Sequence, residues 1–328
     1  MSKTNSNSTL FLIDGSTFIF RAYFAMYKAS QSRGSGFTRS DGTPTGAVMA
    51  FCNMMWKIIT NGIDGIHPSH IAVIFDTKEK TFRSDIYPLY KANRDAPPED
   101  LIPQFPLIHK AVEAFNIKCI SQIGYEADDL IATYSKIATK RNIKTIIISG
   151  DKDLMQLIDN NVRMYDPMPG KERFIDINGV QDKFGVAPDK VVDVQALAGD
   201  TTDNIPGVPG IGIKIASELI NEYHTLEGLL SNAKEIKQNK RRENLLKYAE
   251  DARISYQLAL LDASSPIELD IDDLSNNQLD YDKIISFSKE MELSNLSSRI
   301  NNFFSKGESI HLESSNAGVG NAAAISSN

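Results

Sequence analysis

Apolar runs rich in isoleucine and valine alternate with helix-like stretches through the first half of this 328-residue chain. The apolar runs lie at 10–13, 71–75, 117–120, 145–148 and 162–165. Between them lie helix-like stretches, among which are 45–60, 104–116 and 126–140. Strand and helix patterns that alternate in this way indicate an α/β fold, in which a mostly parallel sheet is covered by helices on both faces.

Acidic residues end or directly follow three of these runs, in the segments LFLIDG, IAVIFD and ISGDKD. Ligands of an open α/β sheet bind outside the carboxyl ends of its strands, so we expect Asp14, Asp76 and Asp151 to converge. The segments GYEADD and GDTTDN add two further clusters of acids. The clustered acids are Asp14, Asp76, Glu126, Asp128, Asp129, Asp151, Asp153, Asp200 and Asp203.

So many carboxylates can share one site only if cations neutralise them. Hard divalent cations with oxygen ligands fit best, because the chain has no suitable cluster of cysteine or histidine. Two such cations, roughly 3.5–4 Å apart, would activate a water, orient a phosphate and stabilise the leaving oxygen of a phosphodiester. Solvated loop acids are the simpler explanation for any one cluster, but they do not explain five clusters together.

The net charge of the chain is −7, which taken alone argues against binding to nucleic acid. The nine clustered acids contribute −9, so the rest of the chain carries +2 and is mildly basic. The distribution of charge therefore permits a nucleic-acid partner, although its sum does not suggest one.

No apolar run approaches the roughly 18–20 residues of a membrane span. The start, MSKTNSNSTL, lacks the apolar core of a signal peptide. Cys52 and Cys119 lie in apolar stretches without CxxC spacing, which is typical of core packing in a reducing compartment. We therefore expect a cytoplasmic location and no membrane partner.

Residues 187–305 predict helices joined by short loops, and within them GVPGIGIKIASELI places glycine turns ahead of a helix that begins near Ile213. The free amides of that helix end would meet a DNA phosphate. The pattern resembles a helix-hairpin-helix element at 205–220, which grips the duplex backbone without reading its sequence. An ordinary glycine-rich turn between helices is the alternative. The expected DNA contacts of this region are Gly207, Gly210, Gly212, Lys214, Lys240, Arg241 and Arg242.

The stretch 77–103 interrupts the alternation with charges and four prolines. Its first part, 77–94, has a net charge of +3, and Tyr87 and Tyr90 stand among the basic side chains. This mixture suits a single-stranded backbone with bases that stack, although a solvated charged loop has the same composition. Because prolines and charges offer little to bury, we expect the loop to be mobile without DNA.

The segments FDTKEKTFRSDIYPLYKANR, GYEADD, SGDKDLMQL and LAGDTTDNIPGVPGIGIKIA together resemble the 5′ nuclease domain of bacterial DNA polymerase I. That domain belongs to the flap endonuclease superfamily, and the resemblance covers about residues 9–300. It implies a flexible start at 1–9, a PIN-like nuclease domain at 10–186 and a helical arch at 77–103. It also implies a helical DNA-binding domain at 187–305, and the small polar residues of 306–328 predict a disordered tail.

In that family one metal site uses acids that match the first seven of the nine, and the second depends on acids that match Asp200 and Asp203, with Asp153 near both. The implied cofactors are two Mg²⁺ ions, for which Mn²⁺ can substitute, and a monovalent cation such as K⁺ held by backbone oxygens near Val208 to Ile213. Lys91 and Arg94 fall on the YKxxR motif that steers the scissile phosphate. Further expected DNA contacts are Arg21, Tyr23 and Arg83.

The resemblance implies a structure-specific 5′-3′ exonuclease and 5′-flap endonuclease that removes flaps and RNA primers in DNA replication and repair. Its partners would be DNA with a 5′ flap, nick or 5′ end and RNA primer–DNA hybrids, and its location the bacterial nucleoid. The usual polymerase chain continues for hundreds of residues, so a polymerase domain or partner is also expected. The sequence fits both a stand-alone nuclease and the N-terminal piece of a polymerase.

Three other classes were weighed against the sequence. A haloacid-dehalogenase-type phosphatase needs a second aspartate two residues after the first, and Ser16 stands there. A PIN-domain RNase shares the fold but is shorter and has no hairpin module. A non-catalytic DNA-binding module would be supported by the loss of Asp200 or Asp203, and both are present.

Overall fold

The structure is a computed structural model and describes residues 8–33, 36–168, 170–276 and 278–306. Most of the predicted flexible start and of the predicted disordered tail, at 1–7 and 307–328, lies outside these ranges. Among the described residues, no helix is both long enough and apolar enough to cross a membrane.

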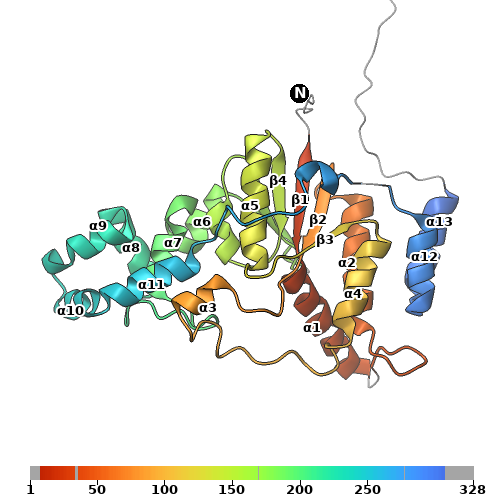
Figure 1. The fold of residues 1–328 in the computed structure, drawn as a ribbon, viewed down its shortest axis with the longest axis horizontal. Coiled ribbons are helices and arrows are strands. Elements are labelled where there is room, and N and C mark those ends of the chain that lie inside the picture. The colour runs from red at the N-terminus through yellow and green to blue at the C-terminus, as the bar shows by residue number, and fades with distance from the viewer. Residues whose placement is uncertain (1–7, 34–35, 169, 277, 307–328) are drawn as a thin grey trace, which may run out of the picture.

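One six-stranded sheet lies at the centre of the molecule, with the strand order β3-β2-β1-β4-β5-β6 (Figure 1). Strands β1 to β5 run parallel and β6 is antiparallel to β5, which confirms the mostly parallel sheet. The five predicted apolar runs agree with β1 to β5 within one residue at each end. The strands are β1 (Thr9–Asp14), β2 (His70–Ile74), β3 (Lys118–Ile120), β4 (Lys144–Ile148), β5 (Val162–Asp166) and β6 (Arg173–Ile175).

Alternate residues of the strands face two separate cores, as the two-residue period of a β-strand requires. Phe11 and Ile13 of β1 lie in a core with α1, α2 and α4, whereas Leu10 and Leu12 lie in a core with α5. Helices therefore cover both faces of the sheet, as predicted. These elements are α1 (Gly15–Arg33), α2 (Gly46–Asn61), α3 (Phe82–Ile86), α4 (Gln104–Ala114), α5 (Ala127–Lys140) and the 3-10 turn η1 (Asp153–Leu157).

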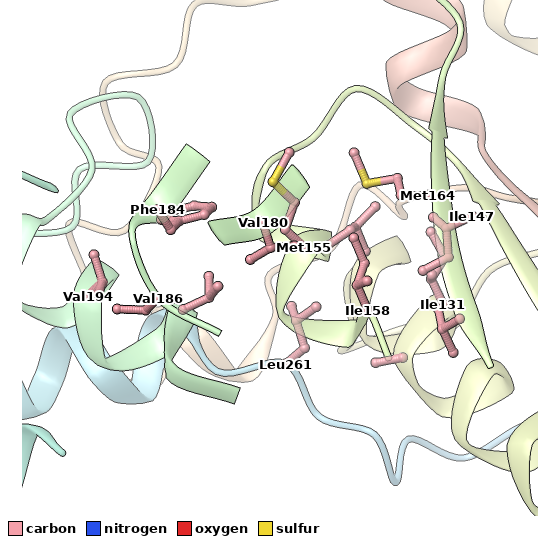
Figure 2. Packing of buried hydrophobic residues seen from close by; sticks show 14 of the residues in the cluster. Ile131, Ile147, Met155, Ile158, Met164, Val180, Phe184, Val186, Val194 and Leu261 are labelled. Atoms are coloured by element: carbon pink, nitrogen blue, oxygen red, sulfur yellow. The ribbon is translucent and has the colours of Figure 1, made fainter. Parts of the chain in front are cut away.

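Six helices follow the sheet and extend to one side of it (Figure 1). Their apolar side chains continue the α5 core, since Ile147 of the sheet, Met155 of η1 and Phe184 of α6 belong to one cluster (Figure 2). The helical segment is thus held to the sheet by a shared core. Its elements are α6 (Ile177–Phe184), η2 (Pro188–Lys190), α7 (Val191–Ala198), α8 (Ile213–Tyr223), α9 (Leu226–Ser231), η3 (Ala233–Glu235), α10 (Asn239–Lys247) and α11 (Ala249–Ala259).

After α11 the chain passes through η4 (Ile271–Leu274) and returns to the opposite face of the sheet. Helices α12 (Tyr281–Glu290) and α13 (Ser294–Ser305) bury Ile284 and Ile300 in the core that contains α2 and α4. Trp56 of α2 packs edge-on against Phe303 of α13, with 5.5 Å between ring centroids. The last two helices of the predicted 187–305 region therefore pack against α2 and α4, which cover the sheet, rather than with α6 to α11.

The segment 77–103 crosses from β2 to α4 and contains α3. It rests on the turn at 200–204, where the Lys91 amide donates to the Asp203 carbonyl at 2.9 Å and the Asn204 side chain donates to the Leu89 carbonyl at 2.7 Å. The expectation that this segment has little to bury is wrong at three positions, because Arg83 is 1%, Tyr90 is 9% and Leu101 is 0% exposed.

Candidate active site

Acidic side chains gather at the carboxyl edge of the sheet because three neighbouring strands deliver them there. Asp14 is the last residue of β1, and Asp76 and Asp151 follow β2 and β4, the two strands that flank β1. The chain leaves β1 toward β2 on one side and occupies β4 on the other, which is the switch point where open α/β sheets bind ligands. A cavity of about 370 Å³ opens at this edge. Its acidic lining is Asp14, Asp76, Glu126, Asp128 and Asp151.

The first turn of α1 explains the residues that follow Asp14. A Cβ atom on Gly15 would lie 2.4 Å from the Phe75 ring, so the helix can begin against β2 only with glycine there. Ser16 then donates to Asp76 at 2.6 Å, and the Thr17 amide donates to Asp14 at 3.0 Å. Hydrogen bonds from one helical turn thus orient two carboxylates that come from different strands.

Burial and mutual repulsion raise the pKa values of several of these carboxyl groups. Burial raises the pKa of Asp14 to about 6, with a smaller contribution from the charge of Asp76. Burial, followed by the charge of Asp151, raises the pKa of Asp153 to about 7. The pKa of Asp128 is held well above its ordinary value by burial and then by the charges of Asp151, Asp14 and Asp76. A site with this excess of negative charge favours bound cations.

The donor set fits divalent cations that keep part of their water. Among the described residues, no three acidic, histidine or cysteine side chains are grouped closely enough to hold an ion by themselves. Mg²⁺ is usually held by one or two carboxylates and several waters, so a complete cage of protein ligands is not needed. Five carboxylates around one cavity supply the oxygen ligands and the charge for such an ion.

The second acidic cluster lies beside the first and is joined to it by basic side chains. Lys152 pairs with Asp200 at 2.5 Å, and its hydrogen bond lowers the pKa of Asp200 against the opposing effect of burial. The Lys91 Nζ lies 2.9 Å from Glu126 and 3.8 Å from Asp203, so it bridges the two clusters. Lys152 is absent from the predicted site, although its place between two clustered aspartates in ISGDKD was a signal.

Lys91 and Arg94 both reach the acidic site, which brings the two predicted arch cations to it. Arg94 pairs with Asp203 at 2.5 Å while its side chain remains 49% exposed. Burial would lower the pKa of Lys91, but the charge of Glu126 raises it overall. Both side chains line the cavity and stay cationic there.

Asp129 and Arg83 differ from their predicted roles. Asp129 is 0% exposed, and each of its oxygens accepts a hydrogen bond from Arg83 at 2.7 Å. The prediction that Asp129 ligates a metal is therefore wrong for direct contact, because the guanidinium occupies it. The prediction that Arg83 contacts DNA is also wrong, because the same pairing buries it.

Tyr23 is a third correction, whereas the predicted contact of Arg21 with DNA stays a prediction. Tyr23 is 7% exposed and donates its hydroxyl to Asp100 at 2.8 Å, so it anchors the end of the 77–103 segment instead of facing DNA. Arg21 lines the cavity and donates to Asp166 at 3.0 Å. Its other terminal nitrogen finds no hydrogen-bond acceptor in the part of the chain that the structure describes.

Two aromatic residues of the cavity were missed by the sequence analysis. Phe20 and Phe24 of α1 line it together with the acids, and Phe24 is 51% exposed. Their spacing of four residues places them on one face of the helix, but that pattern is equally typical of a buried face.

The three predicted hairpin glycines differ in why the backbone needs a glycine at each position. Gly207 has φ +61°, and a Cβ atom there would lie 2.4 Å from the Gly199 amide nitrogen. Gly210 has φ +80°, as a tight turn requires. Gly212 has neither a positive φ nor a neighbour within 4 Å of a Cβ position, so the fold leaves its backbone open to an approaching group. It caps α8, whose first turn carries the exposed Lys214.

The predicted monovalent-cation loop and the basic run are partly used inside the protein. The Val208 carbonyl accepts from the Ile211 amide at 3.0 Å, and the Pro209 carbonyl accepts from the Asn244 side chain at 2.7 Å. On α10, Arg242 donates to the Ile236 carbonyl at 2.8 Å and so has a structural contact. The neighbouring side chains Lys240 and Arg241 are exposed and half-buried, respectively.

The comparisons with known proteins agree with this architecture. The family described as "5′-3′ exonuclease, N-terminal resolvase-like domain" matches residues 9–185, and "5′-3′ exonuclease, C-terminal SAM fold" matches residues 186–282. The matched domains and the fold they describe are those of a class of nucleases. The chain belongs to the 5′-3′ exonuclease family, whose members are DNA-hydrolysing enzymes.

Two curated relatives show how this chain compares in length. It is 49% identical to DNA polymerase I of Rhizobium leguminosarum over 294 residues, which are 89% of this chain and 28% of the polymerase. It is 34% identical to a 5′-3′ exonuclease of Aquifex aeolicus over 300 residues, which are 90% of this chain and 96% of that protein. The chain therefore spans less than a third of the Rhizobium polymerase and nearly all of the Aquifex exonuclease.

Solved structures show the same fold at low sequence identity. A T5 5′-exonuclease with bound zinc has a TM-score of 0.61 and 21% identity, with 90% of this chain and 98% of that chain covered. Flap endonuclease-1 from Methanococcus jannaschii has a TM-score of 0.58 and 17% identity, with 92% and 93% covered. These matches confirm the fold class predicted from the sequence.

Proposed function

We propose that this chain is a structure-specific 5′ nuclease that hydrolyses DNA phosphodiesters with two divalent cations. The observation that carries the proposal is the single cavity in which five carboxylates face Arg21, Lys91 and Arg94. Carboxylates that hold cations and basic groups that hold phosphate are the two requirements of metal-assisted phosphodiester cleavage. The zinc-bound T5 5′-exonuclease supports a divalent metal, and we propose Mg²⁺, with Mn²⁺ as a substitute.

The acids would form two metal sites according to their positions. Asp14, Asp76, Glu126, Asp128 and Asp151 would hold one ion at the cavity, and Asp153, Asp200 and Asp203 would hold the second beside it. When bound, the two ions supply an activated water and stabilise negative charge on the leaving oxygen. Asp129 contributes to this arrangement only through Arg83.

The basic side chains would bind and orient the phosphate. Lys91 and Arg94 lie on Glu126 and Asp203, so cations that neutralise those acids would release them to the scissile phosphate. Arg21 is held by Asp166 with one nitrogen unused, and that donor would take an adjacent phosphate. These side chains would place positive charge beside the phosphate oxygens, where negative charge increases in the transition state.

The helical segment supplies the grip on the duplex in this proposal. Open backbone at Gly212, with Lys214 in the first turn of α8, suits a sugar-phosphate strand. A monovalent cation such as K⁺ is proposed at the same hairpin. The substrates would be DNA with a 5′ flap, nick or 5′ end and RNA primers on DNA. The four segments that resemble the polymerase I nuclease domain also support a polymerase domain or partner. A DNA substrate would place the protein at the nucleoid.

A 5′-labelled flap duplex tests the function. We expect Mg²⁺-dependent release of an intact flap, no product in EDTA, and no product from Asp128→Asn with Mg²⁺. Product formed in thoroughly chelated buffer would exclude the metal mechanism. Cleavage of single-stranded RNA but not of the flap duplex would favour a PIN-type RNase, and tight binding without any cleavage would favour a non-catalytic DNA-binding module.

A further inference from the structure

Arg83 and Asp129 form a buried ion pair that joins three distant parts of the chain. Arg83 belongs to α3 of the 77–103 segment, and Asp129 belongs to the first turn of α5. Their two parallel hydrogen bonds are both 2.7 Å long, and Arg83 also donates to the carbonyls of Leu258 at 2.9 Å and Leu260 at 3.0 Å. The third part is therefore the end of α11.

Asp129 also accepts hydrogen bonds from the backbone of two other segments. Its Oδ2 accepts from the Glu126 amide at 3.1 Å, and its Oδ1 accepts from the Asp262 amide at 2.9 Å. Glu126 and Asp128, which line the acidic cavity, stand on the turn that this hydrogen bond shapes. A shift of the guanidinium would therefore move two of the proposed metal ligands.

Contacts continue from the same pair toward the glycine hairpin. The Gly207 amide donates to Ser255 of α11 at 2.9 Å, one turn before Leu258. Tyr90, Ile205 and Leu258 form a small apolar cluster between the 77–103 segment, the hairpin and α11. An unbroken series of contacts thus leads from the proposed duplex grip through α11 and Arg83 to the cavity.

The chemistry of the pair favours positioning over simple stabilisation. Removing two charges from water costs about as much as their attraction returns, so a buried pair is weak evidence for stability. Only arginine presents the planar fork that satisfies both carboxylate oxygens and neighbouring carbonyls together. The pair therefore defines an orientation that two apolar side chains of similar size would not define.

We propose that the Arg83–Asp129 pair is a positioning joint that couples duplex binding at the hairpin to the placement of the 77–103 segment and of the metal ligands on α5. Arg83 and Asp129 touch neither metal nor phosphate, and they act through Glu126, Asp128 and Lys91. The proposal rests on the proposed function for its catalytic consequence, but the coupling itself can be measured without cleavage.

The first experiment separates this role from metal ligation. The variants are Asp129→Asn, Arg83→Gln and the double variant, with Asp128→Asn on the same helix as the ligand control and Asp85→Asn on α3 as the neutral control. Because each single variant leaves one buried partner unpaired and can unfold, melting curves accompany every measurement and the neutral double variant is the reference. Ca²⁺ binding by calorimetry and single-turnover cleavage with Mg²⁺ are the readouts.

We expect the double variant to retain Ca²⁺ binding with a modest loss of affinity, because its ligands are present but displaced. It should cleave about 10²-fold more slowly, the loss typical of a small misplacement of catalytic groups. The folded single variants should show losses that do not multiply in the double variant, because they break one interaction. Asp128→Asn should lose Ca²⁺ binding, and Asp85→Asn should behave as wild type. Loss of Ca²⁺ binding in the double variant, or unchanged cleavage, would overturn the proposal.

The second experiment tests the coupling without chemistry. Hydrogen exchange is followed at 82–94 in EDTA, with and without a blunt duplex that lacks a flap. In wild type the duplex should slow exchange at 82–94, and in the double variant it should slow exchange only around 205–220. Equal protection of 82–94 in both proteins would refute the coupling even if the nuclease is active, whereas an inactive wild type would refute only the proposed function.

Discussion

Replacing Lys91 with alanine should slow the chemical step and leave duplex binding nearly unchanged. The Lys91 Nζ lies 2.9 Å from a Glu126 oxygen, a separation that a phosphate oxygen would adopt in its place. At an effective dielectric constant of about 20, two unit charges at that separation attract by about 6 kcal/mol. The side chain is 25% exposed, so solvent screening reduces the useful part to about 3–4 kcal/mol.

That energy corresponds to about 10²–10³-fold in rate, because each 1.36 kcal/mol is a factor of ten. The assay is single-turnover cleavage of a flap duplex at saturating DNA, with Lys80→Ala, an exposed lysine in the same segment, as the control. The control should change the rate by less than about twofold, as exposed substitutions usually do. Higher Mg²⁺ should not restore the Lys91→Ala rate, because the site without lysine is more negative and binds cations at least as well.

Wild-type rates for Lys91→Ala at saturating DNA would refute this reasoning and reduce the segment to a tether. Rescue by Mg²⁺ would also refute it, since the lysine would then act only by neutralising Glu126. Arg94→Ala should follow the same pattern, with a smaller loss because its side chain is 49% exposed.

Three further predictions concern the metal sites and the hairpin. In EDTA the melting temperature should fall as pH rises from about 4 to 7. The reason is that Asp14 and Asp153 have folded-state pKa values above the unfolded value of about 3.9, so the folded protein binds more protons in this range. Mg²⁺ should offset the loss of stability at pH 8, and a melting temperature independent of pH would contradict the raised pKa values. Asp200→Ala and Asp203→Ala should abolish or greatly slow single-turnover cleavage at saturating Mg²⁺ while flap binding holds or tightens, because negative charge is removed near DNA; near-normal rates for both would exclude a second metal site. Lys214→Ala should weaken duplex binding equally for all sequences and lower the salt slope by about one unit, and a strong sequence dependence in a titration would argue against a phosphate contact.

The strands and the acidic edge were predictable because they depend on local patterns. An apolar run with an aspartate at its end or shortly after it gives both a strand and the place where the carboxylate emerges. Asp14 ends β1, and Asp76 and Asp151 follow β2 and β4. Strand β6 was missed because RFI is too short to show a pattern. The packing of α12 and α13 against α2 and α4 was missed because an amphipathic helix does not specify which core it joins.

Charged residues that become buried were the main failures, and their partners explain why. Arg83 was assigned to DNA from the positive charge of its neighbours, but it is buried by carbonyls of Leu258 and Leu260, which lie 175 and 177 residues away in sequence. The sequence does not distinguish Asp129 from the other acids of GYEADD, and only the structure shows its pairing with Arg83. A single sequence carries no signal for such pairings, because composition and periodicity describe only near neighbours.

The close packing of Gly199 against Gly207 fixes the distance between the acidic turn and the hairpin. Gly199 precedes the turn that holds Asp200 and Asp203, and Gly207 lies in the hairpin at 205–220. A Cβ atom on Gly207 would lie 2.4 Å from the Gly199 amide nitrogen, so the two backbones are closely packed. The span from where the duplex would be held to where it would be cut is thus set by main chain alone. A methyl group at Gly207 would push the hairpin away from the acidic turn, and the expected result is a cleavage position displaced along the strand.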